Sequence, residues 1–215
     1  MFRFASMRTD GAELSRVRPT ESTSVRARRV DASRNERILL EAAAGVFAER
    51  GVNAPVRLIA VAAGVGMGTI YRHFPTRADL VIAVYRHQVE SCAAAGRVLL
   101  AESSSPAAAL HAWVDLFVEF LVTKHGLAQA LRDDRTGFDA LHDYFLDRLV
   151  PVCGELLTAT TPDTAEPAIS AYQFMRGIGN LCIRAPEDEG YDPRPLVRLL
   201  ISGVLHEQDQ RAGTS

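Results

Sequence analysis

The segment GVGMGTIYRHFPTRADL, residues 64–80, places three glycines at alternate positions directly before aromatic and basic side chains. Gly64, Gly66 and Gly68 leave the backbone accessible, and Tyr71 and the arginines that follow carry donors suited to phosphate oxygens. Two phosphate ligands fit these residue types. One is a nucleotide cradled by a glycine-rich loop, and the other is the backbone of DNA held by a turn and a short helix.

The glycine spacing disfavours the nucleotide. A dinucleotide-binding fingerprint needs G-x-G-x-x-G after a β-strand. The glycines here are spaced G-x-G-x-G, and the preceding LIAVAAG is an alanine-rich helical segment bounded by Pro55 and Gly64. The chain also contains no Gly-Lys-Ser/Thr element of a P-loop.

Two short helices joined by a glycine-containing turn are typical of a helix-turn-helix, whose second helix enters the DNA major groove. We expect the first helix to begin at Pro55 and to end at Gly64 in a left-handed conformation. The second helix should carry Thr69 to Phe74, with Gly66 and Gly68 bringing its backbone near phosphates. The residues expected where the helices cross are small or apolar: Ala60, Ala63, Gly64, Val65 and Ile70.

The chain outside this motif also shows helical periodicity and no convincing strand, which predicts an all-α fold. A capping box at Ser33 and Glu36 predicts a first helix that ends at Gly51, and Thr76 is the expected N-cap of a fourth helix. The further helices are expected at about 77–101, 106–124, 127–131, 137–158 (with Pro151 a kink), 166–183 and 195–207.

The charge is divided unevenly along the chain. Residues 1–77 contain 13 Arg, no Lys and 7 Asp or Glu, whereas residues 78–215 contain 11 Lys or Arg and 19 Asp or Glu. A basic first third suggests that only this part meets a polyanion. Residues 1–31 are expected to be a disordered, Arg-rich extension, in which Arg26, Arg28 and Arg29 form either a solvated tail or an arm for the DNA minor groove.

Cys92, Cys153 and Cys182 are widely spaced, so neither a disulfide framework nor a zinc site is expected. We interpret them as small buried hydrophobes in a reducing cytoplasm. The apolar runs are shorter than the roughly 18 residues of a membrane span, and the histidines lack metal-ligand spacing. We therefore expect a cytoplasmic protein without membrane segment, cofactor or metal.

Residues 33 to about 80 resemble the DNA-binding domain of the tetracycline-repressor (TetR) family of bacterial transcription regulators. The rest of the chain resembles the ligand-binding and dimerisation domain of that family in class and length. The resemblance implies a DNA-binding domain at 32–80, with a linker helix at about 77–101, a second domain at 82–208 and a disordered tail at 209–215. It is carried by Ile38, Leu39, Ala42, Ala43, Phe47–Gly51, Ile59, Ala60, Ala63–Val65, Gly68–Phe74, Arg77 and Leu80.

The resemblance also assigns roles at the DNA. Arg57 matches a position that can reach a base edge, and Arg suits guanine. Tyr71 has a core alternative, Phe74 is expected in the core, and Arg57 and His73 could be surface charge only. The expected DNA-binding residues are Arg57, Gly66, Met67, Gly68, Thr69, Tyr71, Arg72, His73 and Arg77.

In the second domain the resemblance implies a cavity for a small-molecule effector and a dimer interface. Aromatic composition alone does not distinguish a core from a pocket. The candidate pocket residues are Trp113, Phe117, Tyr144, Tyr172, Met175 and Asn180. The candidate dimer residues, on helices that combine apolar stripes with small residues, are Ala171, Leu196, Leu199, Leu200, Gly203 and Val204.

These observations predict a homodimeric TetR-like repressor that binds palindromic operator DNA and is released by a small-molecule effector. It is not expected to be an enzyme, because the sequence shows no nucleophile–base grouping, metal spacing or paired carboxylates in an apolar run. The alternative is a helical small-molecule-binding protein or enzyme whose helix-turn-helix is only an interaction module.

Overall fold

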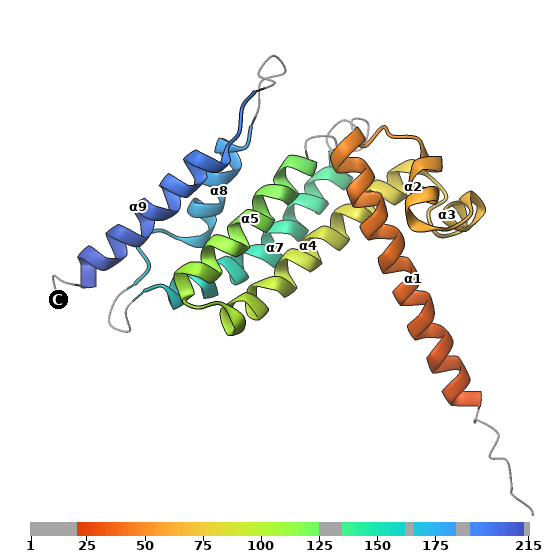
Figure 1. Ribbon diagram of the computed structural model, residues 1–215, viewed down its shortest axis with the longest axis horizontal. Coiled ribbons are helices and arrows are strands. Elements are labelled where there is room, and N and C mark those ends of the chain that lie inside the picture. Colours follow the sequence, from red (N-terminus) through yellow and green to blue (C-terminus); the bar gives the residue numbers. More distant parts are fainter. Residues whose placement is uncertain (1–20, 125–134, 162–165, 184–189, 213–215) are drawn as a thin grey trace, which may run out of the picture. The chain divides into compact units, whose positions relative to one another are not determined.

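The computed structural model describes residues 21–124, 135–161, 166–183 and 190–212. All elements in these ranges are helices, which confirms the all-α class (Figure 1). The predicted helix at 127–131 lies outside the described residues. The helices are α1 Glu21–Arg50, α2 Val56–Ala63, α3 Met67–His73, α4 Arg77–Glu102, α5 Pro106–Lys124, α7 Arg135–Ala159, α8 Ala171–Leu181 and α9 Arg194–Ala212.

The chain divides into two compact units, Met1–Glu36 and Arg37–Ser215. The described part of the first unit is the beginning of α1, a helix that starts at Glu21. The predicted start at Ser33 is therefore wrong, and the part of the expected extension at 21–31 is helical. Residues 21–33 contain neither Gly nor Pro, so the capping pattern at Ser33 lies within a segment that nothing interrupts.

Helices α1 and α2 end at Gly51 and Gly64, as the sequence predicts. Gly51 and Gly64 have φ of 75° and 65°, in the left-handed region that glycine adopts without strain. Pro55 is the N-cap of α2, and the Thr76 side chain caps α4 in a reciprocal arrangement with Asp79. These four predictions are confirmed.

Two other helix boundaries, the start of α8 and the end of α9, differ from the prediction. Helix α8 begins at Ala171 rather than near Glu166, because Ser170 and Gln173 form a capping box there. Helix α9 continues to Ala212, so the expected tail at 209–215 is helical as far as residue 212. The buried Gln208 side chain, bonded to Thr161 at 2.9 Å, fastens the end of α9 to the segment after α7.

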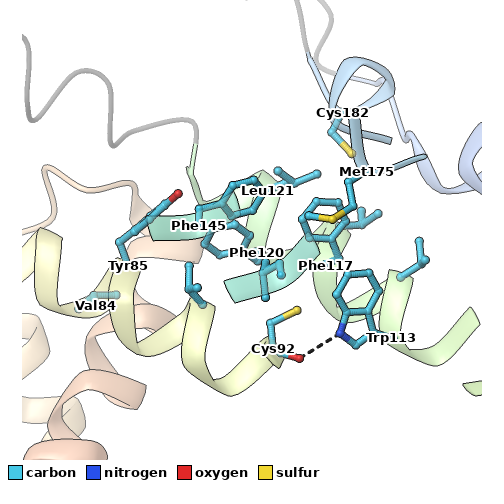
Figure 2. Packing of buried hydrophobic residues seen from close by; sticks show 14 of the residues in the cluster. Val84, Tyr85, Cys92, Trp113, Phe117, Phe120, Leu121, Phe145, Met175 and Cys182 are labelled. Atoms are coloured by element: carbon cyan, nitrogen blue, oxygen red, sulfur yellow. Dashed lines mark hydrogen bonds between the residues drawn. The ribbon is translucent and has the colours of Figure 1, made fainter. Parts of the chain in front are cut away.

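The core of the larger unit lies where α4, α5 and α7 run side by side (Figure 1). Its centre is a series of stacked aromatic rings, shown in Figure 2. Ring centroids are 5.5 Å apart for Trp113 and Phe117, 5.9 Å for Phe117 and Phe145, and 5.6 Å for Phe120 and Phe145. The Trp113 indole donates a hydrogen bond of 3.0 Å to the Cys92 carbonyl, which satisfies its polar group inside the core.

The three cysteines are buried, as predicted. Burial raises the pKa of the Cys92 and Cys153 thiols to about 12 and that of Cys182 to about 11. At neutral pH these groups are thiols rather than reactive thiolates, so they pack as small hydrophobes. Within the described residues, no helix combines the length and hydrophobicity required to cross a membrane.

Helix α4 crosses α7 at Gly96. A Cβ atom added there would lie 2.2 Å from Cγ1 of Val152 and 3.6 Å from Nε1 of Trp113. Non-bonded carbon atoms do not come so close. A valine in a helix strongly prefers one χ1 rotamer, so the Val152 side chain cannot easily rotate away. The missing side chain is therefore a condition for the contact between α4 and α7.

We predict that Gly96→Ala lowers the free energy of unfolding by about 1–3 kcal/mol through overpacking, despite the better helix propensity of Ala. Denaturant unfolding followed by circular dichroism measures this. Gly45→Ala, where an added Cβ meets nothing within 4 Å, is the matched control and should be neutral or stabilising. Adding Val152→Ala to Gly96→Ala should recover part of the loss, and independent effects of the two changes would contradict the predicted contact.

Candidate nucleic-acid interface

Helices α2 and α3 pack together through a small apolar junction. Ile59, Ala60 and Ile70 are buried there, and Val65 is half-buried against the same core. The left-handed Gly64 lets the Val65 N–H return to the Ala60 carbonyl at 3.0 Å. The turn between the helices is thus held by backbone bonds, and α3 is oriented by what it buries.

The opposite face of α3 is exposed. Met67, Gly68, Tyr71 and Arg72, spaced by one helical turn, lie on this face, whereas Ile70 is buried. Tyr71 is 49% exposed, so its core alternative is wrong. Phe74 is buried, as predicted.

The fold does not require glycine at the two glycine positions at the start of α3. Gly66 has φ −74° and ψ 148°, a conformation that any residue adopts. A Cβ added at Gly66 or Gly68 meets nothing within 4 Å. Neither backbone strain nor packing against the described residues requires glycine at positions 66 and 68.

The surrounding charge is entirely basic. From Val56 to Arg77 the chain carries arginines and no Asp or Glu. Arg57 is exposed, as are Arg72 and His73, and Thr69 is half-buried. Sequence reasoning did not select Val61, which is 80% exposed one turn after Arg57. Helical periodicity alone did not show that this apolar side chain is exposed.

The Arg77 side chain is hydrogen-bonded to the loop between α1 and α2. Its Nε donates to the Val52 carbonyl at 2.9 Å, and its Nη2 donates to the carbonyls of Val52 and Ala54. The loop between α1 and α2 leaves these carbonyls without helical partners, and the guanidinium satisfies them. The structure therefore adds a role in holding this loop to Arg77, whose contact with DNA stays a prediction.

The six candidate pocket residues differ in their burial. Trp113, Phe117 and Met175 are buried in the core, whereas Tyr172 and Asn180 are exposed. Trp113 and Phe117 stack on each other, and Phe117 also stacks on Phe145, so the ligand pocket stays a prediction at these positions. A cavity of about 570 Å³ is present elsewhere and is lined by parts of α1, α4 and α5 together with Arg194, none of them among the six.

The sixth residue, Tyr144, belongs to a polar cluster between α4 and α7. Its hydroxyl is hydrogen-bonded to Glu90, and Arg148 pairs with Glu90 at 3.0 Å. Arg86 and Arg148 lie 5.4 Å and 5.6 Å from the centre of its ring. Desolvation raises the pKa of the Tyr144 hydroxyl, and the neighbouring Glu90 carboxylate adds to the shift.

The candidate dimer residues lie on α9, apart from Ala171 at the start of α8, and they differ in exposure. Leu196, Leu199 and Gly203 are exposed, and Leu199 is 68% exposed. Ala171 and Leu200 are half-buried. Val204 is buried with Val197 and Ile201, so it packs within its own chain rather than facing outward. No group of three or more His, Cys, Asp or Glu side chains in the described residues is arranged to hold a metal ion.

Comparison with known proteins decides the family. Residues 39–84, which contain α2 and α3 entirely, match the family described as bacterial regulatory proteins, tetR family. The TetR transcriptional regulator SCO0520 from Streptomyces coelicolor is 31% identical, with 80% of this chain and 97% of that one covered and a TM-score of 0.61. The chain belongs to the TetR family of transcriptional regulators.

Two further TetR-family proteins agree with this. A TetR regulator from Mycobacterium vanbaalenii is 30% identical, with 82% and 98% of the chains covered and a TM-score of 0.60. The HTH-type transcriptional repressor KstR2 from Rhodococcus jostii (strain RHA1) is 33% identical over 97 residues, 45% of this chain. The chain spans about half the length of this curated relative, 48%.

For Arg77 the structure predicts a stabilising role. Arg77→Ala should lower the free energy of unfolding by about 1–2 kcal/mol, because two loop carbonyls lose their donor. DNA affinity should fall without a change in the log–log slope against salt, since no phosphate contact is removed. A slope smaller by about 1 per site would instead identify a phosphate contact. Arg97→Ala, which removes only an exposed ion pair with Glu155, is the control.

Proposed function

We propose that this TetR-family protein is a repressor that binds a palindromic operator as a homodimer through α2 and α3. The exposed face of α3 is the observation that carries the proposal. Met67, Gly68, Tyr71 and Arg72 project from a helix whose other face is anchored in the core, within a segment free of acidic residues. The KstR2 relative is a repressor by name, which favours repression over activation.

Each exposed group has a chemistry suited to DNA. Arg72 on α3 and Arg57 on α2 present guanidinium groups that can pair with guanine O6 and N7. Tyr71, Thr69 and His73 supply donors for phosphate oxygens. Gly66 and Gly68 keep the beginning of α3 free of side chains, so its backbone can approach the duplex closely.

A dimer is proposed because one α3 of seven residues contacts few base pairs, whereas two copies contact a palindrome with fixed spacing. The outward residues of α8 and α9 offer an apolar surface of the kind that helices bury in such interfaces. The exposed apolar residues are Tyr172 of α8 and Leu196 and Leu199 of α9, with Gly203 permitting close approach.

Release by an effector requires a ligand that prefers a conformation with the two α3 helices wrongly spaced. Helix α4 is the proposed connection, because it begins at the helix-turn-helix and continues into the core of the second domain. The raised pKa values of the three buried cysteines disfavour a role for them as thiolate nucleophiles at neutral pH.

DNA binding is tested with a duplex selected from a random pool. Arg72→Ala should lose about 1–3 kcal/mol of binding free energy and relax base preference, and Tyr71→Ala should also weaken binding while helicity is kept. Fluorescence anisotropy at several salt concentrations measures both effects. Arg97→Ala should bind like the parent protein. Equal affinity of the parent protein for selected and random duplexes would exclude the proposed regulator.

The dimer is tested by placing charge on the exposed apolar surface. Leu199→Glu should convert dimers to monomers and weaken operator binding, because an unpaired carboxylate would be buried at the interface. Light scattering coupled to size-exclusion chromatography measures the mass. Val98→Glu, at an exposed position on α4, is the matched control and should remain dimeric. A dimeric Leu199→Glu protein would place the interface elsewhere.

A further inference from the structure

Met67 differs in chemistry from the other exposed side chains of α3. It is the first residue of the helix and is 48% exposed, and Tyr71 follows it by one turn on the same face. Tyr71, Arg72 and His73 all carry hydrogen-bond donors, whereas the Met67 thioether has no donor and is only a weak acceptor. Any contact that this side chain makes with another molecule is therefore mainly apolar.

The two neighbours of Met67 leave its side chain unobstructed. Gly66 and Gly68 carry no side chain, and a Cβ atom added at either position meets nothing within 4 Å. Met67 is thus the one long side chain in this stretch of backbone, and its three rotatable bonds let it adapt to a partner surface. A partner that approaches the backbone at the two glycines also meets the Met67 side chain.

Exposed apolar side chains and positive charge occur together in this segment. Val61 is 80% exposed and Tyr71 is 49% exposed, so three large apolar residues are exposed between positions 61 and 71. The segment from Val56 to Arg77 contains no Asp or Glu. The partner that fits this surface is a polyanion with apolar groups at its centre, and the major groove of DNA has both properties.

The major groove offers a single methyl group on its base edges. Guanine, adenine and cytosine present hydrogen-bond donors and acceptors there, whereas thymine presents O4 and the C5-methyl group. The first turn of a recognition helix lies against these base edges. A side chain without donors gains contact with the thymine methyl group, but it would leave the polar edge of another base without a partner.

We propose that Met67 is a specificity-determining residue that contacts the C5-methyl group of a thymine in each operator half-site. This contact adds a base preference that Arg57 and Arg72 cannot supply, because their guanidinium groups suit guanine. The proposal rests on the DNA binding proposed above and deepens it by naming one base of the operator.

The test removes only the methyl group from the DNA. In a duplex selected from a random pool by the full-length protein, each thymine is replaced in turn by 2′-deoxyuridine, symmetrically in both half-sites. At one position the parent protein should lose affinity about fourfold for each half-site, the value for burial of one methyl group, and so about fifteenfold for the palindrome. Fluorescence anisotropy measures the affinities.

Two variants of Met67 separate its apolar contact from its structural role. Met, Leu and Gln have similar helix propensities, so circular dichroism should show the same helicity for Met67→Leu, Met67→Gln and the parent protein. Met67→Leu should keep the uracil effect, because its side chain is still apolar. Met67→Gln should bind the thymine and uracil duplexes equally. Val61→Ala, which truncates an exposed apolar side chain on α2, is the control and should keep the effect.

The assignment is overturned if no uracil replacement weakens binding by the parent protein, or if Met67→Gln shows the same uracil effect as the parent. Loss of the effect in Val61→Ala instead would move the methyl contact to α2 and also overturn it. In each of these cases the parent protein still binds its selected duplex, so the proposed regulator stands. A parent protein that binds selected and random duplexes equally excludes the regulator itself.

Discussion

Helix α4 is the element on which the remaining structure depends, and it is constrained at two separated points. At its beginning, Thr76 caps it and Arg77 holds the carbonyls of Val52 and Ala54, so the loop before α2 moves with α4. Fewer than two turns from its end at Glu102, Gly96 allows contact with α7 at Val152. A helix fixed at both points cannot bend to absorb a change at one of them without breaking hydrogen bonds or contacts at the other.

The aromatic core is tied to the same helix. Trp113 is hydrogen-bonded to the Cys92 carbonyl of α4 and stacked on Phe117, which in turn stacks on Phe145 of α7. Separating these rings would open the contact between α4 and its neighbours and expose large apolar surfaces.

Local features of the fold were predictable from sequence because their causes are local. The left-handed glycines Gly51 and Gly64 and the Thr76 cap depend on a few adjacent residues. The start of α1 was missed because a capping pattern does not end a helix when the preceding residues also favour one. Ser170 and Gln173 carry the same type of signal at the start of α8. That start was missed because the apolar spacing suggested a helix that began several residues before the cap.

The candidate site was predictable to the extent that exposure follows periodicity. Tyr71 is exposed about 100° around the helix from the buried Ile70, as the helical spacing predicts. The partner of Arg77 could not be predicted in this way, because Val52 is 25 residues earlier and only tertiary packing brings its carbonyl near. Likewise, no pattern shows whether aromatic residues stack together or line a cavity, since both arrangements use the same spacing.

The energetic demand on an effector follows from the same geometry. Moving a regulator from almost entirely operator-competent to almost entirely incompetent requires about 5.5 kcal/mol of difference in ligand affinity between the two states. A single exposed ion pair provides only a small part of this. Burial of apolar ligand surface in one of the two states and not in the other, at about 25 cal/mol per Å², is the larger available source. In a dimer two such sites act on one equilibrium, so each needs to supply about half of the total.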